Sequence, residues 1–174
     1  MGKNTAYIDG QNLFLGTTKH PDTPWTVDLS RLRVYLRDKY QVAEAYYYIG
    51  YVSPEHQQLY DEIQRAGFIL RFRKHNSDML SLKKGNVDTD IVFDVMQGLY
   101  KNTFQGGVVL VSGDGDYYRL VELLQTEGKL VKVLFPNAKR ASSLYDKKIR
   151  TRYSVDLSDP DIRKKIGRKK KGAT

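Results

Sequence analysis

The chain of 174 residues predicts an α/β fold with a mainly parallel sheet and helices on both faces. Strand-like segments rich in β-branched and aromatic residues alternate with segments whose apolar residues recur at helical spacing. Residues 107–112 form a continuous apolar run, which is typical of a strand buried on both sides in a parallel sheet. The length suits one domain with a full core. The 40% hydrophobic and 28% charged residues are typical of a soluble globular protein.

The expected strands are short, and most are bounded by turn-forming residues. The first ends at Asp9-Gly10, the second holds Tyr46, Tyr47 and Tyr48, and the fifth is closed by Pro136. The predicted strands cover residues 5–8, 42–52, 68–74, 107–112, 130–135 and 152–157.

The expected helices lie between these strands and carry start and stop signals. Pro54 suits the first turn of one helix, and Gly67 and Gly128 are expected to end two of them. The predicted helices cover residues 28–40, 54–66, 87–101, 117–127 and, as a short element, 142–148. Residues 77–86 and the proline-containing residues 17–24 predict loops, and the second of these loops could border a site.

The absence of cysteine excludes disulfides, thiolate nucleophiles and cysteine-based zinc sites. The three histidines are scattered, so zinc chemistry is not expected. No apolar run reaches the length of a membrane span, and the start of the chain lacks the features of a secretory signal. We therefore expect no membrane partner and a cytoplasmic location. A homo-oligomer or a protein partner remains open.

The net charge of +9 is concentrated near the C-terminal end. Residues 158–174 contain seven basic and two acidic residues, which makes that segment +5. We expect a domain over residues 1–157 followed by a basic tail over residues 158–174. A concentrated basic segment favours a polyanionic partner, most often nucleic acid, although a tail that only increases solubility is the alternative.

Aspartates follow two of the predicted strands, at the edge of an open α/β sheet where ligands bind. Asp9 follows the first strand, and Ser112-Gly113-Asp114-Gly115-Asp116 follows the strand at 107–112. Asp88 opens the helix at 87–101. Converging carboxylates repel one another unless a cation joins them, and oxygen ligands suit Mg²⁺ or Mn²⁺. Such an ion could assist the cleavage of a phosphodiester.

Helical geometry separates the three aspartates of residues 87–101. The apolar residues that must face the sheet lie within about 60° of Asp88 around the helix axis. Asp94 lies about 120° from Asp88, on the flank, and Asp90 about 160° away, where it should face solvent. The geometry therefore ranks Asp88 before Asp94 and Asp94 before Asp90. The structural alternative is that Asp88 and Asp116 cap helices and that the Asp-Gly sequences form ordinary turns.

Three motifs, in this order, resemble those of the NYN domains, the LabA-like branch of the PIN-like nucleases. They are Tyr7-Ile8-Asp9-Gly10-Gln11-Asn12, then Lys84-Gly85-Asn86-Val87-Asp88 with Asp94 downstream, and Val111-Ser112-Gly113-Asp114-Gly115-Asp116-Tyr117. In the last motif, Tyr117 stands where the family has phenylalanine, and either ring is expected to pack under the loop. The resemblance covers about residues 4–157.

The resemblance implies a Rossmann-like, three-layer α/β/α PIN-like fold with strand order 3-2-1-4-5. It also implies a metal-dependent ribonuclease. By motif matching, Asp9, Asp88, Asp114 and Asp116 would be both the catalytic and the metal-binding residues. Asn12 would orient Asp9 or a water on the metal, Ser112 would support the loop, and Asp94 would assist. Lys84 could contact phosphate. The basic tail lies outside the resemblance, and its charge alone suggests that Lys169 and Lys170 could bind RNA.

Arg71, Arg73 and His75 share one face of the strand at 68–74 and could follow an RNA backbone. Protection of a sheet edge by charge is the alternative.

The sequence favours a Mg²⁺- or Mn²⁺-dependent endoribonuclease. A non-catalytic RNA-binding or regulatory module on the same fold is the second hypothesis. A phosphatase of the haloacid-dehalogenase type is disfavoured because Gln11, not an acid, follows Asp9 by two residues. A nicotinamide enzyme is disfavoured because no Gly-x-Gly-x-x-Gly follows the first strand.

Overall fold

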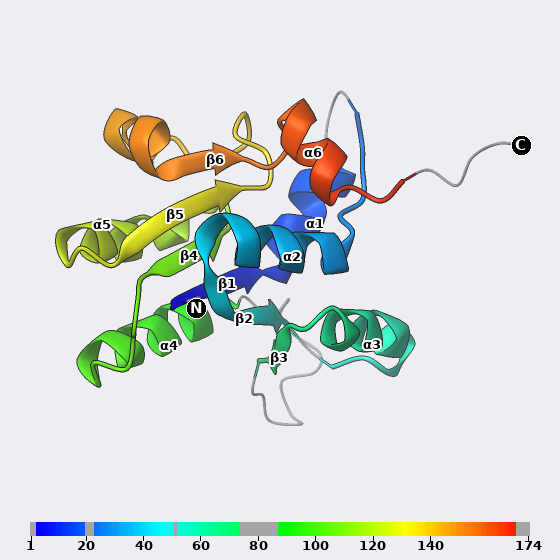
Figure 1. The fold of residues 1–174 in the computed structure, drawn as a ribbon, viewed down its shortest axis with the longest axis horizontal. Coiled ribbons are helices and arrows are strands. Elements are labelled where there is room, and N and C mark those ends of the chain that lie inside the picture. Colours follow the sequence, from blue (N-terminus) through cyan, green and yellow to red (C-terminus); the bar gives the residue numbers. More distant parts are fainter. Residues whose placement is uncertain (1–2, 20–22, 51, 74–86, 170–174) are drawn as a thin grey trace, which may run out of the picture.

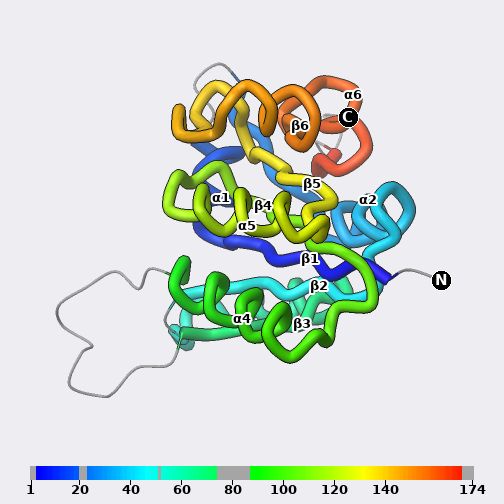
Figure 2. Tube along the Cα trace, turned by 90° about the vertical axis from the view of Figure 1, so that its left-hand side faces the viewer, coloured from blue at the N-terminus to red at the C-terminus, as the bar shows by residue number. Residues whose placement is uncertain are grey.

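The computed structural model describes residues 3–19, 23–50, 52–73 and 87–169. Within these residues, six strands form one sheet in the order β3-β2-β1-β4-β5-β6, and each neighbouring pair is parallel. Figure 2 shows this order from the bottom of the view to the top. The predicted order 3-2-1-4-5 is confirmed, and β6 extends the sheet beyond β5.

The strands agree with the predicted segments to within a few residues at their ends. They are β1 (Asn4–Asp9), β2 (Val42–Ile49), β3 (Ile69–Phe72), β4 (Val108–Val111), β5 (Leu130–Phe135) and β6 (Ser154–Asp156). Within β4 every side chain is buried, as its continuous apolar run predicts.

The helices fill the connections between the strands. They are α1 (Gly10–Thr18), α2 (Leu29–Tyr40), α3 (Gln57–Arg65), α4 (Asp88–Tyr100), α5 (Tyr118–Thr126) and α6 (Pro160–Ile166). Short 3-10 helices, η1 (Pro54–His56) and η3 (Gly115–Tyr117), precede α3 and α5. Gly67 and Gly128 lie just after α3 and α5 with φ of 88° and 64°, so each takes the left-handed conformation that favours glycine after a helix.

Two apolar clusters cover the two faces of the sheet. Leu13 of α1, Leu32 of α2, Ile63 of α3 and Ile166 of α6 belong to the cluster on one face. The other face packs against α4 and α5. The molecule therefore has three layers, helix–sheet–helix, as Figure 1 shows.

Two predicted segments differ from the structure. Residues 10–18 form α1, although the sequence predicts no helix there and assigns residues 17 and 18 to a loop. Residues 142–146 form turns rather than the start of a helix, and a π-helix, η4 (Ile149–Tyr153), comes before β6. The predicted loop at 77–86 lies outside the described residues.

The basic segment after residue 157 begins with a packed helix. Asp159 caps α6 by accepting hydrogen bonds from the backbone N–H groups of Asp161 and Ile162, and Ile166 is completely buried against α2 and the sheet. Gly167 then pairs with Val27 in an antiparallel bridge. Residues 158–167 therefore contribute to the core, and the separation of residues 158–174 as a distinct unit stays a prediction.

We predict that Ile166→Ala lowers the free energy of unfolding by about 2–5 kcal/mol, because it leaves a cavity between α6 and α2. Urea denaturation measures the change. Lys165→Ala, at an exposed position of the same helix, is the control and should change stability little. Equal stability of the two variants would contradict the packing of α6.

Candidate metal centre

The carboxyl ends of β1 and β4 lie side by side because the two strands pair in parallel, with Ile8 opposite Val111. Asp9 is the last residue of β1, and Asp114 follows β4 by three residues. Both aspartates are therefore delivered to the same edge of the sheet, as the sequence predicts. Gly10 allows a tight approach here, since a Cβ atom on it would lie 2.7 Å from the backbone oxygen of Tyr48.

Asp88 completes a group of three carboxylates. It is the first residue of α4, and its side chain is only 6% exposed. Asp88, Asp114 and Asp116 each offer an oxygen that lies within 4.8 Å of the others. An all-oxygen ligand set of this charge suits a hard divalent cation, so the residues present fit Mg²⁺ or Mn²⁺.

Asp9 lies behind this group and is joined to it by Tyr117. The Tyr117 hydroxyl oxygen is 2.8 Å from Asp88 Oδ1 and 3.1 Å from Asp9 Oδ2, and the Tyr117 side chain is completely buried. One hydroxyl carries one proton, so Tyr117 donates to one carboxylate at a time. The hydroxyl is therefore placed to donate either to Asp88 Oδ1 or to Asp9 Oδ2.

The surroundings of Asp9 make its ionisation harder than that of an ordinary aspartate. Burial raises the pKa of Asp9 to about 6, and the charges of Asp88 and Asp114 act in the same direction. The backbone N–H of Asn12 and the Tyr117 hydroxyl partly oppose this rise. Burial, followed by the charges of Asp9 and Asp88, also raises the pKa of Tyr117 far above its ordinary value, so the phenol remains a donor.

The loop that carries Asp114 and Asp116 is held by hydrogen bonds on both sides. Ser112 Oγ accepts from the backbone N–H of Asp114 at 3.1 Å, and the supporting role expected for Ser112 stays a prediction. Asn12 Oδ1 accepts from the backbone N–H of Gly113 at 2.9 Å. The backbone N–H of Asn12 donates to Asp9 Oδ1, and the side chain of Asn12 joins the β1 and β4 loops. The role expected of Asn12, to orient Asp9 or a water on the metal, stays a prediction. The Tyr145 hydroxyl donates to the Asp114 carbonyl from the other side.

Helix capping accounts for two of the four aspartates. Asp9 caps α1 by accepting from Asn12 N, and Asp114 caps η3 by accepting from Asp116 N. Asp88 lies inside the first turn of α4, after the cap residue Val87, and Asp116 lies inside η3. Capping therefore does not explain Asp88 and Asp116, and both belong to the three-carboxylate group.

The other two aspartates of α4 do not belong to this group. Asp94 accepts a hydrogen bond from the Tyr48 hydroxyl, so it is anchored to β2 on the flank of the helix. Asp90 is half-buried, with one oxygen shielded from solvent, and the expectation that it faces solvent is therefore wrong. The assisting role expected of Asp94 stays a prediction.

Comparison with known proteins identifies the family. The NYN domain model matches residues 5–153. The chain belongs to the NYN domain family. It is 29% identical over 164 aligned residues to the "Low amplitude and bright protein LabA" of Synechococcus elongatus, which covers 88% of this chain and 82% of that protein. A protein of unknown function from Vibrio parahaemolyticus shares the fold, with a TM-score of 0.72 at 22% identity over 91% of this chain and 94% of that chain.

The NYN domain thus has a nuclease-type fold with an acidic cluster that could hold a metal ion. Sequence reasoning treats Tyr117 only as a packing ring, whereas its hydroxyl reaches two carboxylates. The one signal in the sequence is the tyrosine itself, which stands beside Asp116 where the family motif has phenylalanine. Tyr145 and its contact with the Asp114 carbonyl carry no signal in the sequence.

The residues expected to bind RNA lie on other elements than the acidic cluster or outside the described residues. Arg71 is exposed on β3, an edge strand, and its guanidinium lies over the ring of Tyr46 at 5.1 Å. Arg73 is half-buried just after β3, and Lys169 is exposed after α6. Lys84, His75 and Lys170 fall outside the described residues.

The raised pKa of Asp9 predicts a pH-dependent stability of the metal-free NYN domain. Folding shifts this pKa from 3.8 to about 6, so the folded protein binds more protons than the unfolded chain in that range. The contribution of Asp9 is greatest below pH 4 and is lost as the pH rises through about 6. The loss amounts to about 3 kcal/mol for a shift of about two pKa units.

Asp9→Asn removes this dependence, because the amide keeps the cap of α1 and can donate to Tyr117. Relative to the wild type, the variant should gain stability between pH 4 and pH 7, measured by urea denaturation in EDTA. Asp61→Asn on α3 controls for the loss of one negative charge. Parallel curves for the wild type and Asp9→Asn would contradict the raised pKa of Asp9.

Tyr117→Phe should keep the fold and destabilise the metal-free protein by about 1–3 kcal/mol, because buried carboxylate oxygens lose a donor. Urea denaturation in EDTA at pH 7 measures the loss. Tyr118→Phe is a matched control in the next residue, whose hydroxyl bonds only to the exposed Glu122. If the two substitutions lowered the free energy of unfolding equally, the Tyr117 hydroxyl would have no particular role in stability.

Proposed function

We propose that this NYN domain is a divalent-metal-dependent endoribonuclease that hydrolyses RNA phosphodiester bonds at the acidic cluster. The observation that carries the proposal is the convergence of Asp88, Asp114 and Asp116 within 4.8 Å at the carboxyl edge of the sheet. Membership of the NYN family supports the same chemistry.

The donor set favours Mg²⁺ or Mn²⁺ over zinc, because the described site offers carboxylates and no sulfur or imidazole ligand. When bound, such a cation acts as a Lewis acid on the scissile phosphate and supplies an activated water. Asp88, Asp114 and Asp116 would hold it. Asp9, only 4% exposed, is a further carboxylate joined to the group through Tyr117, and when it is ionised its attraction for the cation is weakly screened by water.

The remaining residues position the cluster and the substrate. Ser112, Asn12 and Tyr145 fix the loop that carries Asp114 and Asp116, so the carboxylates are in place before substrate arrives. The basic residues Arg71, Arg73, Lys84, Lys169 and Lys170 are proposed to contact the phosphates of RNA. Catalytic roles for Asp9, Asp88, Asp114 and Asp116 are part of this proposal.

Within the described residues, no helix is long and apolar enough to cross a membrane. A cytoplasmic location and a homo-oligomer or protein partner stay predictions.

We predict that the purified protein cleaves RNA with Mn²⁺ or Mg²⁺ and not with EDTA, and that Asp114→Asn slows cleavage about 100-fold or more. The asparagine oxygen can still accept from Asp116 N, so the loop should keep its shape. The assay compares single-stranded and structured RNA, and circular dichroism verifies the fold of the variant. Asp61→Asn is the matched control for charge.

Each outcome points to one class of protein. Wild-type cleavage rates for Asp114→Asn, with EDTA sensitivity retained, would overturn the site. Salt-dependent RNA binding without any product under Mn²⁺ would favour a non-catalytic RNA-binding or regulatory module. Rapid hydrolysis of a small phosphoester, without RNA cleavage, would favour a phosphatase.

A further inference from the structure

A series of cationic side chains continues from the acidic cluster along the carboxyl edge of the sheet. It lines two neighbouring hollows, which we name the near hollow and the far hollow. The near hollow, of about 280 Å³, is lined by Asn12, Gly113, Lys19 and Arg140 among others. The far hollow, of about 820 Å³, is lined by Trp25, Arg163, Lys164, Arg168 and Lys169 among others.

The near hollow is joined directly to the acidic cluster. Asn12 and Gly113, which share the hydrogen bond between the β1 and β4 loops, form part of its wall. On the other side, Arg140 Nη1 donates to the carbonyl oxygen of Lys19 at 2.9 Å. This contact ties the turn after β5 to the residue that follows α1, and both residues line the near hollow.

The far hollow exists because α6 is held against the segment that leads into α2. The backbone N–H of Asp28 donates to Ile166 O, and the backbone N–H of Arg168 donates to Thr26 O, each at 2.8 Å. Arg163 extends across the hollow, donating to Thr23 Oγ1 at 2.7 Å with its guanidinium 5.6 Å from the Trp25 ring. The cations of the basic segment are thus fixed in place by the fold.

The two hollows border each other through the turns after β5 and β6. Leu157 N donates to Phe135 O, and Ala138 N donates to Asp156 Oδ1, so these two turns are joined. The first turn carries Arg140 of the near hollow, and the second carries Ser158 of the far hollow. Figure 1 shows α6 beyond the arrowhead of β6, at the same end of the sheet where the strands finish.

The charged side chains that line the two hollows are all positive. Among the described residues, the lining of the two hollows includes six cations and no carboxylate: Lys19, Arg140, Arg163, Lys164, Arg168 and Lys169. Nearby acids are engaged elsewhere or at the rim. Asp159 caps α6, Asp161 pairs with Lys164 at 3.4 Å, and Glu62 pairs with Arg168. These pairs are exposed, and a phosphate can compete for their cations.

We propose that the near and far hollows hold one unpaired RNA strand, whose phosphates follow this series of cations away from the acidic cluster. The inference rests on the proposed function and extends it to the form of the substrate. Asp9 and Asp88 are only 4% and 6% exposed, whereas Asp114 is half-buried and Asp116 is exposed, so the scissile phosphate approaches the cluster from the side of Asp116. A flexible strand can adjust its phosphates to the cations of both hollows, whereas the phosphates of a stiff duplex keep a fixed arrangement.

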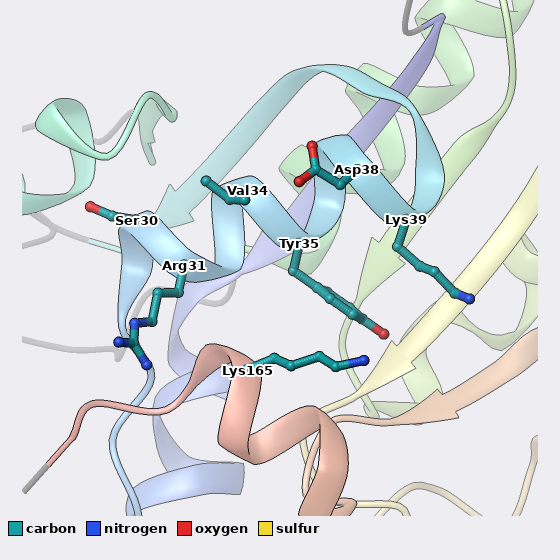
Figure 3. A pocket seen from close by; sticks show the side chains of 7 residues that line it. All are labelled: Ser30, Arg31, Val34, Tyr35, Asp38, Lys39 and Lys165. Carbon is teal, nitrogen blue, oxygen red and sulfur yellow. The ribbon is translucent and has the colours of Figure 1, made fainter.

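A third hollow, between α2 and α6, is lined by cations that do not belong to this path. Figure 3 shows Lys165 extending beside Tyr35, with Lys39 and Asp38 at the other end of the same hollow. Lys165 lines this third hollow and neither hollow of the path, although it neighbours Lys164 in the chain. This arrangement provides control residues on the same helix.

The test compares two triple variants in EDTA, where RNA binds without being cut. The path variant carries Lys19→Gln, Lys164→Gln and Lys169→Gln, and the control carries Lys39→Gln, Lys101→Gln and Lys165→Gln. All six lysines are exposed, and both variants lose the same charge. Fluorescence anisotropy with a labelled single-stranded RNA at several salt concentrations gives the dissociation constant and its salt dependence.

We expect the path variant to bind about 10- to 100-fold more weakly at 0.1 M salt, with its salt slope reduced by about 2. The control should keep the wild-type slope. Equal weakening of both variants, or no binding by the wild type, would overturn the path. Wild-type binding of a blunt duplex as tight as that of the single strand would overturn the unpaired form.

Trp25 gives a second measurement that does not depend on substitutions. It is the single tryptophan of the chain, and it lies beside Arg163 in the far hollow. RNA binding should change its fluorescence in EDTA. Anisotropy that reports binding with no change at Trp25 would overturn the far hollow as part of the path.

The result of the binding test does not depend on whether the protein cleaves RNA. If RNA is cut with Mn²⁺ while the path and control variants bind equally, the path is wrong and the nuclease stands. If the path variant alone loses binding while no RNA is cut under any metal, the path stands and the nuclease is wrong.

Discussion

The convergence of four carboxylates at one edge of a buried parallel sheet is the constraint on which the rest of the site depends. Parallel pairing of β1 and β4 brings Asp9 and the Asp114 loop together, and α4 adds Asp88. The site offsets their repulsion in two ways within the protein. Asp9 lies at the N-terminal end of α1 and Asp88 in the first turn of α4, where helix dipoles favour negative charge. Tyr117 shares one hydroxyl between two carboxylates.

Most of the fold follows from local pattern, because strands buried on both faces need continuous apolar runs and helices need a repeating apolar face. α1 escapes prediction because it contains two glycines and has an apolar stretch, Leu13 to Leu15, with no helical spacing. Its formation depends on the Asp9 cap and on packing against the turn after β5. The helix α6 is not predicted because basic residues dominate its sequence. Ile166 is its one buried residue, so the segment shows no repeating apolar face.

The acidic residues of the site are predictable, because each has its own position at a strand end or in a first helical turn. Their contacts are not predictable, because they join residues far apart in the chain. Tyr117 and Asp9 are 108 positions apart, and Asn12 and Gly113 are 101 apart. The angles around the helix axis predict the positions of Asp88 and Asp94 correctly and that of Asp90 wrongly. These angles carry no information about other segments of the chain that shield the outer face of α4 from solvent.

The distribution of charge explains why the cations and the carboxylates occupy separate parts of the same edge. A phosphate backbone is repelled by the carboxylates of the acidic cluster and attracted by the cations of the two hollows. Interspersed cations would pair with the aspartates, neutralise them and leave no site for a metal. Asn12 and Gly113 lie between the two regions as uncharged residues joined by a hydrogen bond. Separation by neutral groups keeps the aspartates available to a cation while the strand is held beside them.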